Sequence, residues 1–157
     1  MENEQQDLLA DLEVNLVQAG SGKRLANYLI DLVVFYILLF CVGVVLAVLD
    51  PTAREDINSV TALGTLVDRL ITLLCYGLYM GLVEGLFKGK SLGKVITGTR
   101  AVNEDGSRIS FMTGFLRGLS KAVPFDAFSA LGQPPYPWHD KWTKTYVIIE
   151  RESSLPA

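Results

Sequence analysis

The chain has 157 residues, a length that favours a single domain. Half of the residues are apolar, and the mean hydropathy of +0.31 is high for a soluble domain of this size. The net charge is -3 and no run of basic residues is present, so nucleic acid is not expected as a partner.

Residues 1–18 form the first predicted segment, an acidic tail. Its acidic side chains have no basic neighbours, which predicts a solvated and partly disordered segment. Leu12, Val14 and Leu16 alternate with polar residues, as in a short strand. The acidic residues of the tail are Glu2, Glu4, Asp7, Asp11 and Glu13.

Two long apolar runs follow, over residues 25–49 and 70–87. Each falls within the range of about 17–25 residues that a helix needs to cross a hydrocarbon core of about 30 Å. The first run is too long for the core of a signal peptide and has no small-x-small cleavage site. Asp50 and Pro51 mark the end of the first helix, and residues 52–69 are polar. We therefore predict an integral membrane protein with a helical hairpin.

The distribution of lysine and arginine predicts the orientation of this hairpin. Basic residues gather before the first helix and after the second, whereas the loop between the helices is net acidic. By the positive-inside rule, both ends of the hairpin face the cytoplasm and residues 50–69 lie outside. We expect Lys88, Lys90 and Lys94, which follow the second helix, to contact anionic lipid headgroups.

Residues 111–131 combine a helical spacing of apolar side chains with formal charges and a proline. Arg117, Lys121 and Asp126 lie within this segment, and Pro124 interrupts it. Each charge at the centre of a bilayer costs about 2.5 kcal/mol or more. We therefore predict an amphipathic or broken helix that is partly inserted. A complete crossing would instead place the C-terminus outside.

The remaining segments predict strands. Residues 95–102 are rich in β-branched side chains, residues 103–106 form a turn signal, and residues 107–111 complete a predicted hairpin over 95–111. Residues 143–150 predict a final strand, and residues 151–157 form a C-terminal tail. A single hairpin is marginally stable in water, so we expect these strands to combine into one small cytoplasmic β-sheet. The predicted fold class is thus membrane α-helical, with two transmembrane helices, a third amphipathic or broken helix and this sheet.

The order of three segments along the chain is informative. They are residues 22–31 (GKRLANYLID), residues 90–102 (KSLGKVITGTRAV) and residues 138–147 (WHDKWTKTYV). Together they frame residues 19–150, and the ordered set resembles the RDD family of small bacterial integral membrane proteins. The resemblance implies a multi-pass protein of the inner membrane. It also implies that Arg24, Asp31 and Asp140 correspond to the arginine and two aspartates of the family name. Most members have no assigned function, and at least one has been associated with sodium/proton antiport. The charged, broken third segment departs from a simple three-span version of the family.

Asp31 and Glu84 are carboxylates inside the two predicted membrane helices. At 1.5 Å per residue, both lie roughly 5–10 Å from the cytoplasmic boundary, a depth that Arg117, Lys121 and Asp126 can reach from the third segment. A charged side chain in a membrane helix is costly and marks a functional site by default. We therefore predict one polar cluster, which either binds a cation or carries protons, or is a satisfied structural network.

No catalytic residue, metal site or cofactor is predicted, and the chain is not expected to be an enzyme. No base is arranged around a nucleophile, and the glycines near residue 90 lack the spacing of a phosphate-binding loop. Cys41 and Cys75 lie in apolar runs, where neither a disulfide nor a metal site is expected. His139, the single histidine, makes either a local turn contact or a proton relay.

Two hypotheses for the function remain open. The first is cation or proton transport of the sodium/proton antiport type, through the intramembrane carboxylates of a homo-oligomer. The second is a membrane scaffold or assembly partner whose charge cluster is structural. Gly77, Gly81 and Gly85 form a ladder that allows close helix approach, either between copies or against the first helix.

One contact is predicted on the cytoplasmic side. If the C-terminus is cytoplasmic, Asp140 returns to the membrane face from which Arg24 emerges, and the two side chains are free to pair. The alternative is that Asp140 caps its own turn and Arg24 contacts a lipid phosphate.

Overall fold

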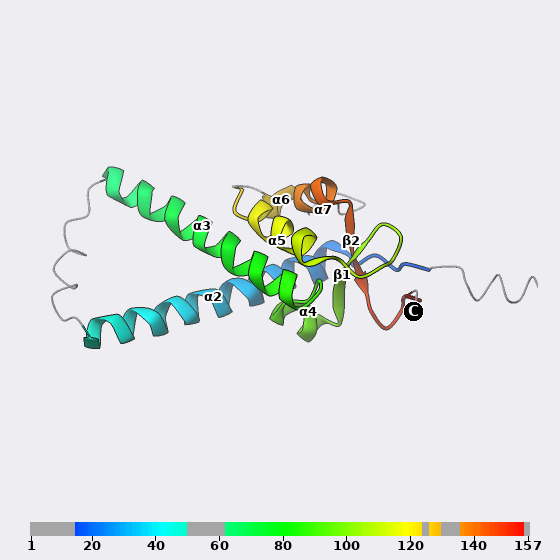
Figure 1. Cartoon of the computed structure of the whole chain (residues 1–157), viewed down its shortest axis with the longest axis horizontal. Helices are drawn as coiled ribbons and strands as arrows, with labels where there is room; N and C mark the ends of the chain where they lie inside the picture. Colours follow the sequence, from blue (N-terminus) through cyan, green and yellow to red (C-terminus); the bar gives the residue numbers. More distant parts are fainter. Residues whose placement is uncertain (1–14, 50–61, 124–125, 130–135, 156–157) are drawn as a thin grey trace, which may run out of the picture.

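The computed structural model describes residues 15–49, 62–123, 126–129 and 136–155 (Figure 1). Two long helices, α2 (Ser21–Leu49) and α3 (Ala62–Leu86), leave a shared region and diverge toward their other ends. We call the shared region, residues 15–35, 76–123, 126–129 and 136–155, the base. The diverging parts, residues 36–49 and 64–75, are the arms. Both helices are long and apolar enough to cross a membrane, as the sequence predicts.

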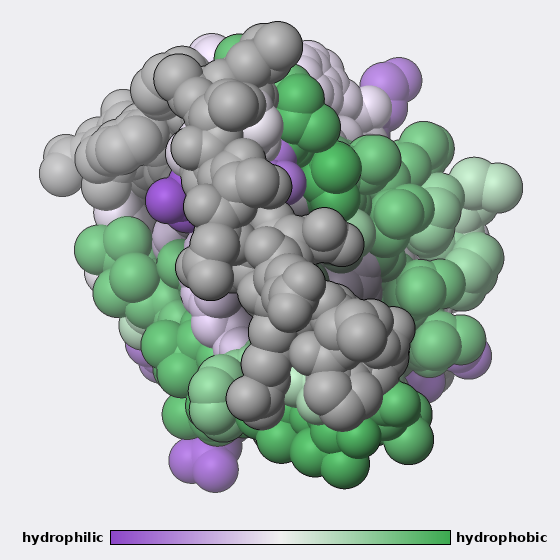
Figure 2. Space-filling view, turned by 90° about the vertical axis from the view of Figure 1, so that its left-hand side faces the viewer, coloured by the Kyte–Doolittle hydropathy of each residue, from purple (hydrophilic) through white to green (hydrophobic). Residues whose placement is uncertain are grey.

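Helix α2 is buried only in its first half. Its buried side chains are Arg24, Asn27, Asp31 and Phe35, whose spacing of three or four residues places them on one face. Along residues 36–49 every side chain is exposed except that of Ala47, which is half-buried. Seen from the arms, much of the surface beside the grey segment is hydrophobic (Figure 2). Such an apolar surface suits a lipid surrounding or a partner rather than water.

Helix α3 begins at Ala62, so its predicted start at residue 70 is wrong. Asp68 and Arg69 lie inside the helix with exposed side chains, and the Thr72 hydroxyl donates to the Asp68 carbonyl over 2.7 Å. Exposed charged residues cost a helix only a few tenths of a kcal/mol, roughly. The apolar run therefore marks the part of the helix suited to a membrane and not the point where the helix begins.

Helix α5 (Phe111–Ser120) packs against the base half of α3 with almost no space between the backbones. A Cβ added at Gly118 would lie 1.9 Å from the backbone nitrogen of Gly81, and one at Gly114 would lie 2.7 Å from the Glu84 carbonyl oxygen. Small residues on both helices permit this approach. The ladder therefore packs against the third segment within the chain, and not against the first helix as we had considered. Its members facing α5 are Gly77, Gly81 and Gly85.

The predicted third segment is a broken helix. Helix α5 ends at Ser120, and the short α6 (Asp126–Ser129) follows it. The ten residues of α5 rise only about 15 Å, about half of a hydrocarbon core, so α5 alone cannot cross a bilayer. Pro124 and the predicted end of the segment at residues 130–131 lie outside the described residues.

The sheet has two antiparallel strands, β1 (Thr99–Asn103) and β2 (Thr145–Ile149), with Ala101 opposite Val147. On the other edge of β2, the Ala19 amide donates to the Val147 carbonyl and the Ile149 amide donates to the Val17 carbonyl, each over 2.8 Å. Ala19, Ala101 and Val147 form a small core with Ile109. The predicted N-terminal strand is centred on residues outside the described part, and residues 17–19 make the contact with the sheet.

The predicted hairpin over residues 95–111 is wrong in two respects. Its first residues belong to helix α4 (Leu92–Thr97), which Ser91 caps and which Gly98 ends at a φ of 68°, a conformation that glycine adopts without strain. After the turn, only one bridge forms, between Val102 and Arg108. The return strand has no room because Ser110 already caps α5. Strand β1 pairs instead with β2, whose predicted bounds of 143–150 are shortened by helix α7 (Trp138–Thr143).

Candidate functional site

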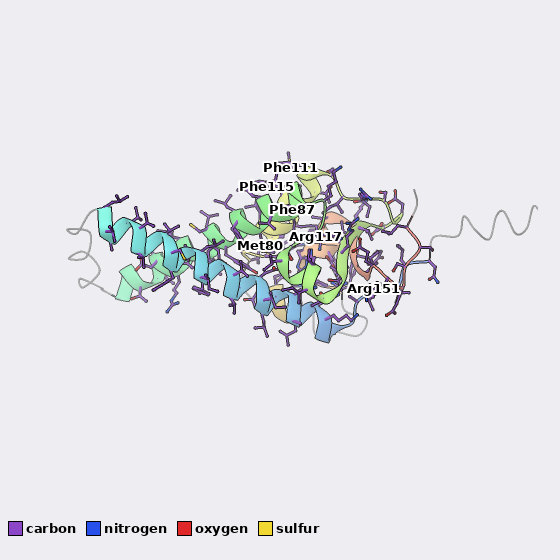
Figure 3. All side chains as sticks on the ribbon, turned by 90° about the horizontal axis from the view of Figure 1, so that it is seen from below. Met80, Phe87, Phe111, Phe115, Arg117 and Arg151 are labelled. Carbon is purple, nitrogen blue, oxygen red and sulfur yellow. The ribbon has the colours of Figure 1, made fainter. Side chains whose placement is uncertain are left out.

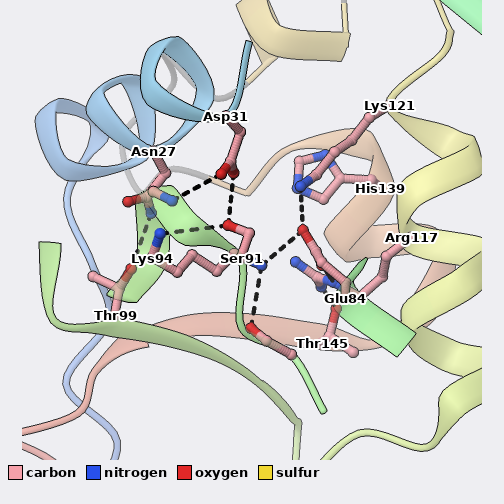
Figure 4. Close-up of polar contacts among 12 residues, drawn as sticks. Asn27, Asp31, Glu84, Ser91, Lys94, Thr99, Arg117, Lys121, His139 and Thr145 are labelled. Atoms are coloured by element: carbon pink, nitrogen blue, oxygen red, sulfur yellow. Dashed lines mark hydrogen bonds and ion pairs between the residues drawn. The ribbon is translucent and has the colours of Figure 1, made fainter. Parts of the chain in front are cut away.

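Glu84 is completely buried at the base end of α3, and three cations surround its carboxylate (Figure 4). Its Oε1 lies 2.9 Å from the Lys94 Nζ, and its Oε2 lies 3.1 Å from the Arg117 Nε. The Lys121 ammonium also contacts Oε1. We call these four residues the Glu84 cluster. One carboxylate facing three cations is fully compensated, as buried charges in proteins generally are.

Each cation reaches Glu84 for a local structural reason. Arg117 comes from α5, which the glycine contacts bring onto α3, and Figure 3 shows it in the interior of the base. Lys121 caps the C-terminal end of α5. Lys94 lies on α4, and the turn before α4 is closed by a 2.8 Å hydrogen bond from the Gly89 amide to the Glu84 carbonyl. The cluster thus joins α3, α4 and α5.

A second carboxylate extends this network toward the start of α2. The Asp140 Oδ1 lies 2.7 Å from an Arg117 nitrogen, and its Oδ2 lies 2.5 Å from the Arg24 Nη1. The Arg24 Nε also donates to the Ala19 carbonyl over 3.0 Å. The predicted pair of Arg24 and Asp140 is therefore confirmed. It ties α7, just before the last strand, to the first turns of α2.

Burial and ion pairing shift the pKa values of the buried charged side chains in opposite directions. Burial raises the pKa of Asp140, but the neighbouring Arg117, His139 and Arg24 outweigh burial and hold that pKa well below its usual range. Burial lowers the pKa of Arg117, and the Asp140 and Glu84 carboxylates more than restore it. For Lys94 burial prevails over Glu84 and lowers the pKa to about 7. Lys94 is thus the cation of the Glu84 cluster that titrates near neutral pH.

Asp126 does not join the Glu84 cluster, in contrast to the predicted grouping. Its Oδ2 lies 2.5 Å from the His139 Nδ1, and its Oδ1 accepts the His139 amide over 3.1 Å. The His139 Nε2 faces Asp140 at 3.4 Å. Burial lowers the pKa of His139 below its usual value, which favours the neutral ring. His139 thus bridges α6 and the start of α7 through a residue thirteen positions earlier in the chain, and not through the predicted local turn contact. The proton relay stays a prediction.

Asp31 is almost as deeply buried, at 3% exposure, but its partners are neutral. Its Oδ2 accepts from the Ser91 hydroxyl over 2.6 Å, and its Oδ1 accepts from the Gly93 amide over 2.8 Å. Among the described residues, no cation lies within ion-pair distance of this carboxylate. The prediction that one cluster holds both intramembrane carboxylates is therefore wrong. Together, Asp31, Ser91, Gly93 and Tyr76 make up what we call the Asp31 site.

Tyr76 belongs to this site because of how its ring packs. The ring lies 6.3 Å from that of Tyr28 and 5.2 Å from that of Phe35, centroid to centroid. Tyr28 and Phe35 flank Asp31 on the same face of α2, so Tyr76 covers that face at the level of Asp31. Its hydroxyl is buried and has no hydrogen-bond partner within the described part of the chain.

Helix α4 positions Ser91 and Gly93 because it packs directly on α2. A Cβ at Gly93 would lie 2.5 Å from the Asn27 carbonyl oxygen, so only glycine allows this approach. The Asn27 side chain donates to the Thr99 hydroxyl over 2.9 Å and accepts from Thr97. Sequence reasoning missed Ser91, Gly93 and Tyr76. The glycines of the segment at residues 90–102 were the only signal of a close backbone approach, and Gly93 is the one that makes it.

The structure separates the three lysines that we expected at lipid headgroups. Lys94 is 3% exposed and points into the Glu84 cluster, so this expectation is wrong for Lys94. Lys90 is half-buried and lies 2.8 Å from Glu150. Lys88 is exposed and makes no ion pair within the described residues. The lipid contact of Lys88 and Lys90 stays a prediction.

Within the described residues no group of three or more histidine, cysteine, aspartate or glutamate side chains is arranged to hold a metal ion. Cys41 and Cys75 are free and exposed on the two helices. A family model described as the RDD family matches residues 18–147. No curated protein and no solved structure matches the chain.

Proposed function

We propose that this chain, which belongs to the RDD family, carries a cation or a proton across a bacterial inner membrane, with Asp31 as the ion- or proton-binding carboxylate. The observation that supports this proposal is that the two buried carboxylates of the base, Glu84 and Asp31, differ in how their negative charge is compensated. The buried Asp31 has a hydroxyl and an amide as donors and no cationic partner among the described residues. A proton or a small cation would supply the missing positive charge.

The chemistry around Asp31 suits such a ligand. The Ser91 and Tyr76 hydroxyl oxygens are hard donors of the kind that bind alkali and alkaline-earth cations. The Ser91 hydroxyl can rotate, so it can donate to the bare carboxylate or offer its lone pair to a cation. Asp31 lies six positions after Leu25, where the apolar run begins, about 9 Å along the helix axis. That depth suits an exchange step at one side of a bilayer.

A transport path would require more than one copy of the chain. Two helices cannot enclose a path, and the arms of α2 and α3 diverge with apolar side chains exposed. We propose that copies associate through the arms and that both termini face the cytoplasm, as the lysine and arginine distribution predicts. Lipid fills the remaining apolar surface.

The alternative function, a scaffold or assembly partner, is supported by the Glu84 cluster. Glu84 and Asp140 are compensated by Lys94, Arg117, Lys121 and Arg24, which is what a rigid structural network requires. This reading assigns Glu84 to structure and not to ion binding. It leaves Asp31 unexplained, and for that reason we rank it second.

A flux assay on the full chain reconstituted in liposomes tests the proposal. With a pH-sensitive dye inside, an outward or inward gradient of Na⁺, K⁺ or Li⁺ should move protons faster than in protein-free liposomes. Asp105→Asn, a change to an exposed carboxylate in the turn after β1, should keep this flux. Flux equal to that of protein-free liposomes, for every cation and for a proton gradient alone, would leave the scaffold as the better account.

A further inference from the structure

An apolar groove with a volume of about 280 Å³ runs between α3 and α4. One wall consists of Tyr79, Val83 and Phe87, which are four residues apart and so lie on one face of α3. Leu92 and Val95 of α4 form the other wall. The volume is slightly below the range of about 300–1,000 Å³ typical of small-molecule pockets. A groove of this size and lining fits one hydrocarbon chain.

Positive charge is in excess where the groove ends. Lys90 lines that end and shares the Glu150 carboxylate with Arg100, at distances of 2.8 Å and 3.2 Å. Two cations therefore face one anion. The buried Arg100 Nε has no hydrogen-bond acceptor among the described residues. Lys88, two residues before Lys90 in the sequence, is exposed and makes no ion pair within the described residues. This end of the groove can accept an anion without displacing Glu150.

We propose that this groove binds one anionic phospholipid, with an acyl chain between α3 and α4 and the phosphate at Lys90. The apolar walls match the chain, and the excess of positive charge matches the phosphate. The groove also lies at the end of a helix that is long and apolar enough to cross a membrane. A phospholipid has its own headgroup at that level. This inference does not rest on the proposed transport function.

A free phosphate would match only the positive end of the groove, and a neutral lipid would match only its apolar walls. Phosphate alone would leave the walls formed by Tyr79, Val83 and Phe87 exposed to water, and a zwitterionic lipid would bring a cation next to Lys90 and Arg100. The groove therefore distinguishes its ligand by the combination of one chain and a net negative head. The test therefore compares an anionic lipid with a zwitterionic lipid and with a phosphate compound that has no acyl chain.

Native mass spectrometry of the full chain in detergent, titrated with phosphatidylglycerol, measures this binding. We expect one phosphatidylglycerol to bind more tightly than phosphatidylcholine and more tightly than the lipids that follow it. Lys90→Gln should weaken that first binding about fivefold, whereas Lys23→Gln, at an exposed lysine near the start of α2, should not. Val95→Trp should fill the groove and weaken binding at least as much.

Ile96→Trp is the matched control for the groove itself. Ile96 is 64% exposed beside Val95, which is 60% exposed, and Ile96 does not line the groove. Because both positions are exposed, both variants should keep the thermal stability of the parent without lipid. Equal weakening by the two tryptophans, equal binding of phosphatidylcholine, or displacement of the lipid by glycerol 3-phosphate would each overturn the inference.

Discussion

Asp31 and Glu84 are two carboxylates of similar burial, one on each long helix, and their surroundings differ completely. Glu84 faces three cations, whereas Asp31 faces a hydroxyl and a backbone amide. Helix α4 separates the two environments, because Ser91 at its start contacts Asp31 and Lys94 contacts Glu84 (Figure 4). Burial alone therefore does not identify a functional charge. The balance of charge around it is the better guide.

This comparison assigns different costs to neutralising the two groups. A compensated buried carboxylate holds its cations in place, so its loss leaves those cations without a partner. An uncompensated one leaves no cation behind. The following predictions use this difference, in order of expected effect.

Glu84→Gln should destabilise the protein most. Lys94, Arg117 and Lys121 would then surround a neutral amide, and breaking a buried ion pair typically costs about 3–5 kcal/mol. Thermal or denaturant unfolding in detergent measures the loss. Glu152→Gln, at an exposed carboxylate near the C-terminus, should stay within about 0.5 kcal/mol of the parent. A loss for Glu84→Gln no greater than for this control would contradict the structural role of Glu84.

Arg24→Gln and Asp140→Asn should be coupled in a double-mutant cycle. The two side chains form a buried pair at 2.5 Å, and a hydrogen bond between charged groups contributes about 1.5–3 kcal/mol. Asp140→Asn alone should cost more than Arg24→Gln, because Asp140 also pairs with Arg117. The double-mutant cycle subtracts the contribution of the Asp140–Arg117 pair. Additivity of the two losses to within about 0.5 kcal/mol would mean that the pair contributes nothing.

Gly118→Ala should disrupt the Glu84 cluster without touching the Asp31 site. The new methyl would overlap the α3 backbone at Gly81, and forcing extra atoms into a packed contact costs about 1–3 kcal/mol. Gly43→Ala is the matched change in the arm of α2, where a Cβ meets open space. It should stabilise the helix by up to about 1 kcal/mol. The melting temperatures of the two variants should move in opposite directions, and movement in the same direction would contradict the close contact.

Lys94 should make stability depend on pH above neutrality. Its pKa is about 7 when folded, against an ordinary value of 10.5. Between these values the unfolded chain binds a proton that the folded chain has released, so stability should rise as pH increases from about 7 toward 10.5. Lys94→Met keeps the apolar stem, and its melting temperature should rise less over this range. An unchanged slope in Lys94→Met would show that another group is responsible.

The sequence predicted those features that depend on neighbouring residues. The two long helices follow from long apolar runs that few polar residues interrupt, and the break in the third segment follows from Pro124 and the charges. The pairing of Arg24 with Asp140 was also predicted, because a cytoplasmic C-terminus would return Asp140 to the side from which Arg24 emerges. Contacts that depend on how α4 and α5 dock could not be read in this way. Ser91 meets Asp31, and Lys94 turns inward, only because Gly93 lets α4 approach α2.

The dependence on tertiary contacts also explains why the predicted hairpin of the sheet was wrong. Residues 95–97 are β-branched and predicted a strand, but the cap at Ser91 and the left-handed Gly98 make them the end of a helix. Tertiary context overrides such propensities. The pairing of β1 with β2 joins residues far apart in sequence, and no local pattern specifies it.

Asp31→Asn tests most directly whether the uncompensated Asp31, in contrast to the compensated Glu84, is the functional carboxylate. The measurement is the flux per folded protein in liposomes. An asparagine can still accept from the Gly93 amide and can donate to the Ser91 hydroxyl oxygen, so the melting temperature should stay close to that of the parent. We predict that cation- or proton-driven flux falls to the level of protein-free liposomes while the fold is retained. Flux equal to that of the parent in a fully folded Asp31→Asn variant would contradict the account.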